Sequence, residues 1–335
     1  MAAGERRRAP PARSAGTGNG ASARSAGGAS RQRSGSQAAR NGSGGTPSQS
    51  SSSSDDSGGG LAGLISRRAN DWSLESVDPG FVRAQRHVWN LFQDHYFRMD
   101  TEGWHKLPDP PVLIVGVHGA GIFPVDAWMF GLTWFRRFGE QRILHGTAHE
   151  ALMATPMVGT YFRKMGVVSA SRETVSAALE AGRDVIVYPG GDIDSLRPWR
   201  ERDKVKLAGR RGFVKQAIKS GVPIVPLATS GGMDTMFTLT EGKGLARLLG
   251  LNKLARAEAL PLVLGLPWGI APGVLPFLPL PAKIRTELLD PIFLDDDPER
   301  VEDDEYVDKM YSEVEQRIQA GMDRLAARRS FPVFG

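Results

Sequence analysis

The chain has 335 residues and no cysteine, which excludes a disulfide framework and thiolate chemistry. Its charge is unevenly spread. Residues 1–70 hold ten arginines, no lysine and three acidic residues, a net charge of +7, whereas the whole chain carries +5, so the remaining residues carry −2. The basic character therefore belongs to the N-terminal segment and does not indicate a folded surface that binds nucleic acid.

Residues 1–60 consist almost entirely of small and polar residues, and Met1 is the one large apolar residue before Leu61. Such a segment cannot bury enough apolar surface to offset the entropy lost on ordering. We therefore predict a disordered tail over residues 1–60, a linker over 61–80 and a single folded domain over 81–328. No apolar stretch follows the basic start, so a signal peptide is not expected.

Strands and helices alternate along the predicted domain. Apolar residues at helical spacing predict a helix over 81–97, and Asp126 can cap a helix that runs to about Phe138. Short apolar runs predict strands at 112–117, 142–147, 167–170, 184–188, 222–227 and 283–289, and further helices are predicted at 156–165, 173–181, 212–219 and 306–325. This order predicts an α/β fold with a mostly parallel central sheet covered by helices on both faces. Sites in such sheets form at the carboxyl ends of strands.

Residues 259–282 form an uncharged segment that is long enough to span a bilayer. Six prolines and three glycines interrupt it, however, and a spanning helix must satisfy its backbone internally. We therefore expect no transmembrane helix here. The segment is interpreted as a Pro-rich apolar loop that faces the membrane or an acyl chain, with a buried connector as the alternative.

His118 follows the buried strand at 112–117 and opens a Gly-rich turn that contains Gly119 and Gly121. An imidazole in such a position can take a proton from a hydroxyl at neutral pH. A carboxylate on its second ring nitrogen would fix the tautomer, and Asp126 is the nearest candidate in the sequence. The alternatives are a structural turn histidine and a carboxylate that caps the next helix.

Three further segments carry groups that can bind an anion or an acyl carbonyl. Arg172 follows a short strand and could grip a phosphate or carboxylate. The segment from Pro189 to Pro198 combines the flexible glycines Gly190 and Gly191 with Asp192 and Arg197. Arg210 precedes a helix at Gly212 whose N-terminus favours an anion.

In this order, the four segments resemble the lysophospholipid/glycerolipid acyltransferase superfamily, in particular its diacylglycerol acyltransferase-like bacterial branch. The resemblance covers roughly residues 85–295. The family's histidine block falls at His118, its G-x-x-x-x-x-R block at Gly166 to Arg172, its Pro-Gly-Gly block at Pro189 to Asp192, and its Val-Pro-Ile-Val-Pro block at Val222 to Pro226. The R-x-G-F pair of the diacylglycerol-type branch is matched by Arg210, Gly212 and Phe213.

The resemblance implies an enzyme that moves a fatty acyl group from acyl-CoA or an acyl carrier protein to a glycerolipid or lysophospholipid hydroxyl. His118 would be the general base, with Asp126 in support. Backbone amides of the two Gly-rich turns would stabilise the oxyanion, and the arginines would hold anionic substrate groups. Neither a metal nor a bound cofactor is expected. Because both substrates are amphiphilic, we expect a peripheral protein on the cytoplasmic face of a membrane.

Two positions depart from the family pattern. Phe123 stands where the family places aspartate, five residues after the histidine, and Gly190 stands where glutamate often follows the proline. These departures leave the acceptor open and keep a catalytically inactive membrane-binding protein as an alternative. An α/β-hydrolase is a second alternative, but the chain contains no G-x-S-x-G elbow. A dinucleotide-binding loop is disfavoured because Pro124 occupies the third glycine position.

Overall fold

The computed structural model describes residues 73–121, 124–242, 244, 260–273, 275 and 277–331. The predicted tail at 1–60 and the first part of the predicted linker lie outside these residues. The second part of that linker belongs to the folded body, because η1 (Leu74–Ser76) and the start of α2 (Pro79–Ala84) lie in it. Arg183 also donates a hydrogen bond to the Leu74 carbonyl at 3.1 Å. The fold therefore begins before residue 81.

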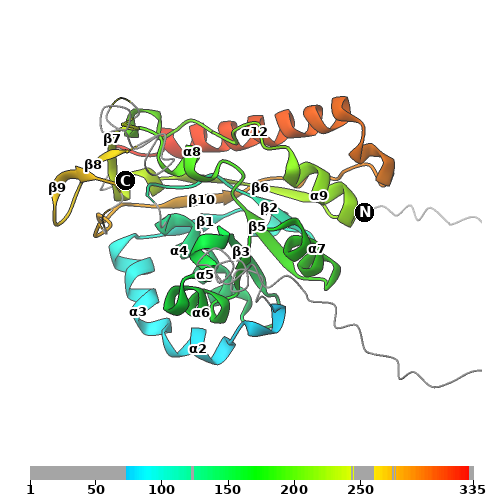
Figure 1. The fold of residues 1–335 in the computed structure, drawn as a ribbon, viewed down its shortest axis with the longest axis horizontal. Helices are drawn as coiled ribbons and strands as arrows, with labels where there is room; N and C mark the ends of the chain where they lie inside the picture. The colour runs from blue at the N-terminus through cyan, green and yellow to red at the C-terminus, as the bar shows by residue number, and fades with distance from the viewer. Residues whose placement is uncertain are drawn as a thin grey trace, which may run out of the picture. The chain divides into compact units, whose positions relative to one another are not determined.

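A seven-stranded sheet forms the centre of the fold (Figure 1). Its strands lie in the order β1 (Asp100–Glu102), β10 (Arg285–Leu288), β6 (Ile224–Ser230), β2 (Leu113–Val115), β5 (Asp184–Val187), β3 (Leu144–Ala148) and β4 (Val167–Ser169). The pairs from β6 to β4 are parallel, whereas β10 runs antiparallel to β6 and pairs in parallel with β1. The predicted mostly parallel sheet is confirmed.

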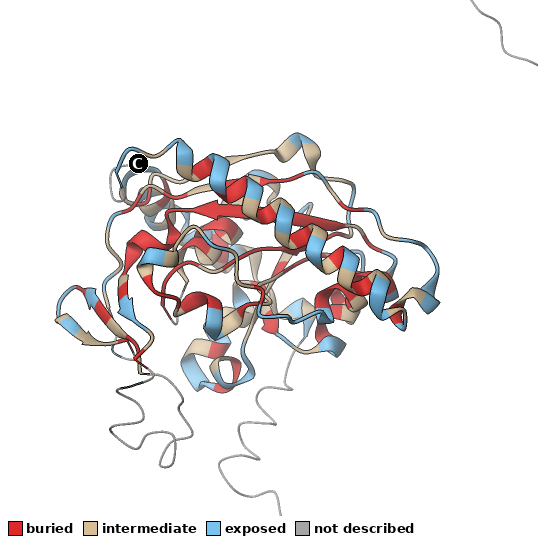
Figure 2. Ribbon diagram, turned by 90° about the horizontal axis from the view of Figure 1, so that it is seen from above, coloured by how far each residue is buried: buried red, intermediate tan, exposed pale blue. Residues whose placement is uncertain are grey.

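Helices cover both faces of this sheet, as predicted. On one face lie α7 (Arg172–Glu180), α9 (Gly212–Ser220) and α12 (Asp304–Ala327), which bury their apolar residues against one face of β2 and β6. The apolar stripe of α12 faces inward, and Figure 2 shows buried and exposed residues alternating along this helix. On the opposite face of the sheet, Phe130 and Trp134 of α4 (Val125–Phe138) pack against the other side of β2 and β6.

Further helices extend the α4 side of the molecule. The helix predicted over 81–97 is built from α2, α3 (Arg86–Leu91) and the π-helix η2 (Phe92–Tyr96). The chain also forms α5 (Glu150–Ala154) and α6 (Pro156–Lys164) between β3 and β4. Other short helices in the described residues include η3 (Trp104–Lys106), α8 (Gly191–Ser195), η4 (Trp199–Glu201), η5 (Gly232–Thr235) and η6 (Pro298–Val301).

The apolar segment expected as a loop at 259–282 contains a β-hairpin. Strands β8 (Leu262–Gly265) and β9 (Gly269–Pro272) pair antiparallel, and β8 also pairs with β7 (Phe237–Thr240). Prolines in the segment indicated a loop, but Pro261, Pro267 and Pro272 stand before a strand, in the turn and at a strand end, where a missing N–H is tolerated. Within the described part of the chain, no helix combines the length and apolar character needed to cross a membrane.

Candidate active site

His118 lies just beyond the carboxyl end of β2, the buried strand that leads to it. Its ring stacks on that of Tyr188, which follows the neighbouring strand β5, with centroids 4.3 Å apart and planes inclined by 11°. Gly116 makes this stacking possible, because a Cβ atom there would lie 2.8 Å from Cε1 of Tyr188. Gly116, two residues before His118, thus makes room for the tyrosine ring.

His118 is one of the residues that line a cavity of about 1420 Å³. This exceeds the range of about 300 to 1,000 Å³ that is common for small-molecule sites. Most of the lining is apolar and aromatic, with Trp128 and Phe135 from α4, Trp89 and Phe92 from the α3–η2 segment, and Tyr161 and Phe162 from α6. The cavity can therefore hold a long apolar ligand beside the imidazole.

The imidazole of His118 is held in its neutral form. Its Nδ1 atom is buried and has no hydrogen-bond partner among the described residues. Burial, together with the nearby Arg197 guanidinium, lowers the pKa of His118 to about 3. A ring that is neutral at physiological pH can accept a proton, but its affinity for that proton is low in the unliganded protein.

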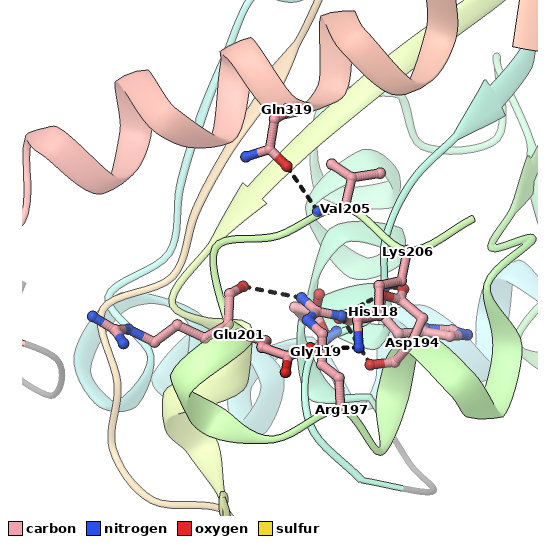
Figure 3. A network of polar contacts seen from close by, with 10 residues as sticks. His118, Gly119, Asp194, Arg197, Glu201, Val205, Lys206 and Gln319 are labelled. Atoms are coloured by element: carbon pink, nitrogen blue, oxygen red, sulfur yellow. Dashed lines mark hydrogen bonds and ion pairs between the residues drawn. The ribbon is translucent and has the colours of Figure 1, made fainter. Parts of the chain in front are cut away.

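A buried ion pair grips the main chain of His118 on both sides (Figure 3). The Asp194 carboxylate accepts a hydrogen bond from the His118 N–H, and Arg197 donates one to the His118 carbonyl at 2.9 Å. The two side chains also pair with each other and are 0% and 1% exposed. Burial raises the pKa of Asp194 to about 7, although the Arg197 charge opposes this shift. The pair fixes the position of the histidine backbone.

The placement of Arg197 favours a structural role over the substrate contact expected from the sequence. Its Nη1 atom donates to Asp194 and to the His118 carbonyl, and its Nη2 atom donates to the Arg202 carbonyl at 3.1 Å. Because the side chain is buried and both terminal nitrogens are engaged within the chain, it offers little to a ligand in the cavity.

Asp126 lies beside the same turn but does not hydrogen-bond to the His118 ring. Pro124, not Asp126, is the N-cap of α4. The Asp126 carboxylate is 2% exposed and accepts a hydrogen bond from the Gly119 N–H at 2.9 Å. Burial raises its pKa to about 6. In this structure it stabilises the turn after His118, and its support of the imidazole stays a prediction.

Three of the four turn glycines use their amides within the protein. The N–H of Gly119 donates to Asp126, that of Gly121 to the Ser195 carbonyl at 3.0 Å, and that of Gly191 to the Tyr188 carbonyl at 3.2 Å. Gly190 is required by packing, because a Cβ atom there would lie 2.0 Å from the Lys206 carbonyl oxygen. These contacts explain the glycines through close packing, and their binding to a substrate stays a prediction.

The remaining predicted binding residues lie at the surface. Asp192 and Arg210 are exposed, line the cavity and pair with each other at 3.1 Å. Arg172 is the exposed first residue of α7 and lies two positions after Ala170, which lines the cavity. Arg172 itself is not a lining residue. Across the described ranges, no group of three or more His, Asp or Glu side chains could hold a metal ion.

Sequence reasoning missed two residues that shape the site. No role was predicted for Asp194 within the segment from Pro189 to Pro198, and Tyr188 was only the last residue of a predicted strand. The register could have indicated Tyr188, because Val115 of β2 pairs with Val187 of β5, which places Tyr188 level with Gly116. Nothing in the sequence pairs Asp194 with the His118 backbone, 76 positions away.

A family model described as diacylglycerol acyltransferase matches residues 78–322, and the chain belongs to this family. An uncharacterised protein of Mycobacterium leprae is 29% identical over 280 residues, which cover 82% of this chain and 74% of that protein. A Gallus gallus protein named as a DGAT1/2-independent enzyme synthesizing storage lipids is 27% identical over 238 residues. The match covers 69% of this chain and 64% of that protein. Human diacylglycerol O-acyltransferase 2 is 30% identical over 152 residues, 43% of this chain and 38% of that protein.

Among solved structures, the 1-acyl-sn-glycerophosphate acyltransferase PlsC of Thermotoga maritima matches with a TM-score of 0.42 and 17% identity. The match covers 79% of this chain and 88% of that chain. Membership in the family, which rests on the sequence model, makes this protein an acyltransferase.

The low pKa of His118 should be visible in solution. We expect the NMR signals of its ring to remain those of neutral imidazole from about pH 8 down to about pH 5, whereas an unperturbed histidine titrates near 6.5. The His118 signals can be assigned by their loss in His118→Gln. A titration midpoint of the His118 signals near pH 6.5 would show that the ring is accessible to water, contrary to the structure.

Breaking the buried ion pair should destabilise the fold strongly. In Arg197→Met, Asp194 must take up a proton or stay charged without its partner, and the His118 and Arg202 carbonyls lose a donor, so we expect unfolding to become easier by about 3–5 kcal/mol. The matched control is Arg210→Met, which removes an exposed ion pair and should cost less than about 1 kcal/mol. Urea denaturation followed by circular dichroism measures both, and equal midpoints for the two variants would contradict the role given to Arg197.

Proposed function

We propose that this protein is an O-acyltransferase that moves a fatty acyl group from an acyl thioester to a glycerolipid hydroxyl, with His118 as general base. The observation that carries the proposal is the position of a neutral imidazole on the wall of a large apolar cavity. The family supports acyl transfer as the reaction. Acyl-CoA and an acyl carrier protein are both candidate donors, and diacylglycerol and lysophospholipids are candidate acceptors.

The proposed reaction needs one proton acceptor and no covalent enzyme intermediate. Nδ1 of His118 is the buried nitrogen, which leaves Nε2 as the atom able to reach an acceptor hydroxyl in the cavity. As Nε2 takes the hydroxyl proton, the oxygen attacks the thioester carbonyl and forms the new ester bond. The carbon–sulfur bond then breaks, and the thiolate leaving group recovers the proton from the imidazolium. Atoms and charge therefore balance over the transfer.

Tyr188 is suited to assist the charged intermediate state of the base. The imidazolium that forms during transfer lies against the face of the tyrosine ring at 4.3 Å between centroids. An aromatic face attracts a cation, by about 2 kcal/mol or more when the pair is desolvated. This contact offsets part of the penalty that burial places on the protonated ring.

The donor's acyl chain fits the apolar part of the cavity. Gly131 of α4 lines the cavity, and a Cβ atom placed there would meet nothing within 4 Å. The helix at this point therefore borders open space that a chain of methylene groups could fill. The exposed lining residues Asp192 and Arg210 would then lie toward the polar part of the thioester donor.

The role of His118 is tested by His118→Ala in the purified full chain. We expect transfer of radiolabelled acyl groups from acyl-CoA to a panel of lipid hydroxyls to fall by about a hundredfold to ten-thousandfold, with the thermal unfolding midpoint little changed. His105→Ala removes an exposed histidine outside the cavity and serves as the control. Undiminished transfer in His118→Ala would overturn the assignment, and release of free fatty acid without any ester product would favour an esterase.

The acyl-chain role of the cavity is tested at Gly131. Gly131→Phe should fill the open space beside α4 and shift the preferred donor toward shorter acyl chains. Gly131→Ala is the control, because it adds one carbon and should mainly stabilise the helix, by about 1 kcal/mol. Competition between acyl donors of different length measures the shift. An unchanged chain-length profile in a folded Gly131→Phe variant would place the acyl chain elsewhere.

A further inference from the structure

The β8–β9 hairpin has two apolar faces, one packed against the rest of the fold and one exposed. Val263 on the inner face is fully buried against Met233 and Met236. On the outer face, the cross-strand partners Leu264 and Ile270 are 42% and 66% exposed. The turn between the strands adds Leu266 and Trp268, which are 55% and 53% exposed. An apolar surface of this kind on a soluble fold marks a place where something else binds.

Charge is missing from this surface. The sequence from residue 259 to residue 282 contains no Asp, Glu, Lys or Arg. Edge strands of soluble proteins usually carry such residues, lysine above all, because charge prevents pairing with other chains. A neutral, apolar hairpin without that protection fits a partner that is itself apolar at the contact.

The apolar surface continues into the cavity that holds His118. Leu278 donates a backbone hydrogen bond to Leu266 at 2.8 Å, is 61% exposed and also lines the cavity. The next residue, Pro279, lines the cavity as well and accepts a hydrogen bond from the hydroxyl of Tyr96 at 2.8 Å. Figure 1 shows the hairpin projecting away from the central sheet, and Figure 2 shows it from above in the same outlying position.

We propose that the β8–β9 hairpin docks the protein on a lipid bilayer, with Leu264, Leu266, Trp268 and Ile270 inserted at headgroup level. Tryptophan is enriched at this depth of membranes because its large ring is amphipathic. Among the described strands, β9 pairs only with β8, and its other edge keeps the hairpin from entering the hydrocarbon core, where free backbone groups are costly. Leu278 then places an edge of the cavity beside the bilayer.

A second copy of this chain fits the hairpin less well. A stable dimer buries about 800 Å² on each partner, and two strands of four residues supply only a small part of that area. Under the proposed function, the lipid acceptor would pass from the bilayer into the cavity. The docking itself is measured without turnover, so its failure would leave the assignment of His118 untouched.

The test is co-flotation of the full chain with vesicles of phosphatidylcholine alone. Neutral vesicles are chosen because the basic segment at residues 1–70 would bind anionic lipid on its own. We expect the wild-type chain to float and the double variant Trp268→Ser/Ile270→Ser to lose at least about tenfold in partition coefficient. Neither substituted residue lines the cavity.

Phe293→Ser is the matched control, since it also replaces an exposed apolar residue by serine. Phe293 lies near the amino end of β6, because its neighbour Ile292 bridges to Ile224. The hairpin, in contrast, comes in the chain after the carboxyl end of β6. The control should float like the wild type. As a measurement that needs no variant, hydrogen exchange of residues 262–272 should slow when vesicles are added.

Three results would overturn the proposal. The first is wild-type protein that stays unbound on neutral vesicles. The second is a double variant that floats as well as the wild type. The third is a wild-type dimer that the double substitution splits, with hydrogen exchange at residues 262–272 unchanged by lipid. The third result would assign the hairpin to a second copy of the chain. Light scattering of both proteins distinguishes it from docking on lipid.

Discussion

The buried ion pair between Asp194 and Arg197 is the constraint on which the geometry of the site depends. Removing two charges from water costs several kcal/mol for each ion, and their mutual attraction repays this only when the remaining hydrogen-bonding groups are satisfied. Here the pair binds the N–H and carbonyl of His118 and the carbonyl of Arg202, which satisfies the two terminal nitrogens of Arg197, whereas its buried Nε has no partner among the described residues. Gln319 of α12 accepts a hydrogen bond from the Val205 N–H and donates one to the Asp203 carbonyl, so the C-terminal helix holds the loop that follows Arg197 (Figure 3).

This arrangement fixes the imidazole at the expense of its basicity. The positive charge that holds the backbone of His118 also lowers the pKa of its ring, and no carboxylate binds Nδ1 within the described residues to compensate. A weak base can still act when the reacting groups are held in place, because good orientation alone is worth about 7 kcal/mol or more. The stack on Tyr188 and the rigid turn supply that orientation. In the proposed reaction, His118 would therefore rely on position more than on proton affinity.

Much of the fold could be predicted because its signals are local. The buried strands β2 and β5 are short apolar runs, and the stripe of α12 has a helical period, so both follow from the sequence. His118 could be placed at a strand end for the same reason. The hairpin β8–β9 was missed because its prolines stand at strand ends, where they do not oppose pairing. The role of Arg197 was missed because burial depends on tertiary packing: a sequence presents an arginine in a loop identically whether it faces a ligand or an internal aspartate.

The lining of the cavity includes exposed residues of opposite chemistry, and in the proposed reaction this difference can separate the two substrates. Asp192 and Arg210 are exposed lining residues that carry charge, whereas Leu278 is an exposed lining residue next to an uncharged hairpin. A thioester donor has a large polar carrier that is costly to desolvate, which favours the charged edge. A lipid acceptor has its apolar chains in a bilayer, which favours the edge at Leu278. In the proposed reaction, each substrate would enter where its own solvation is least disturbed, so the donor and the acceptor would not compete for the same lining residues.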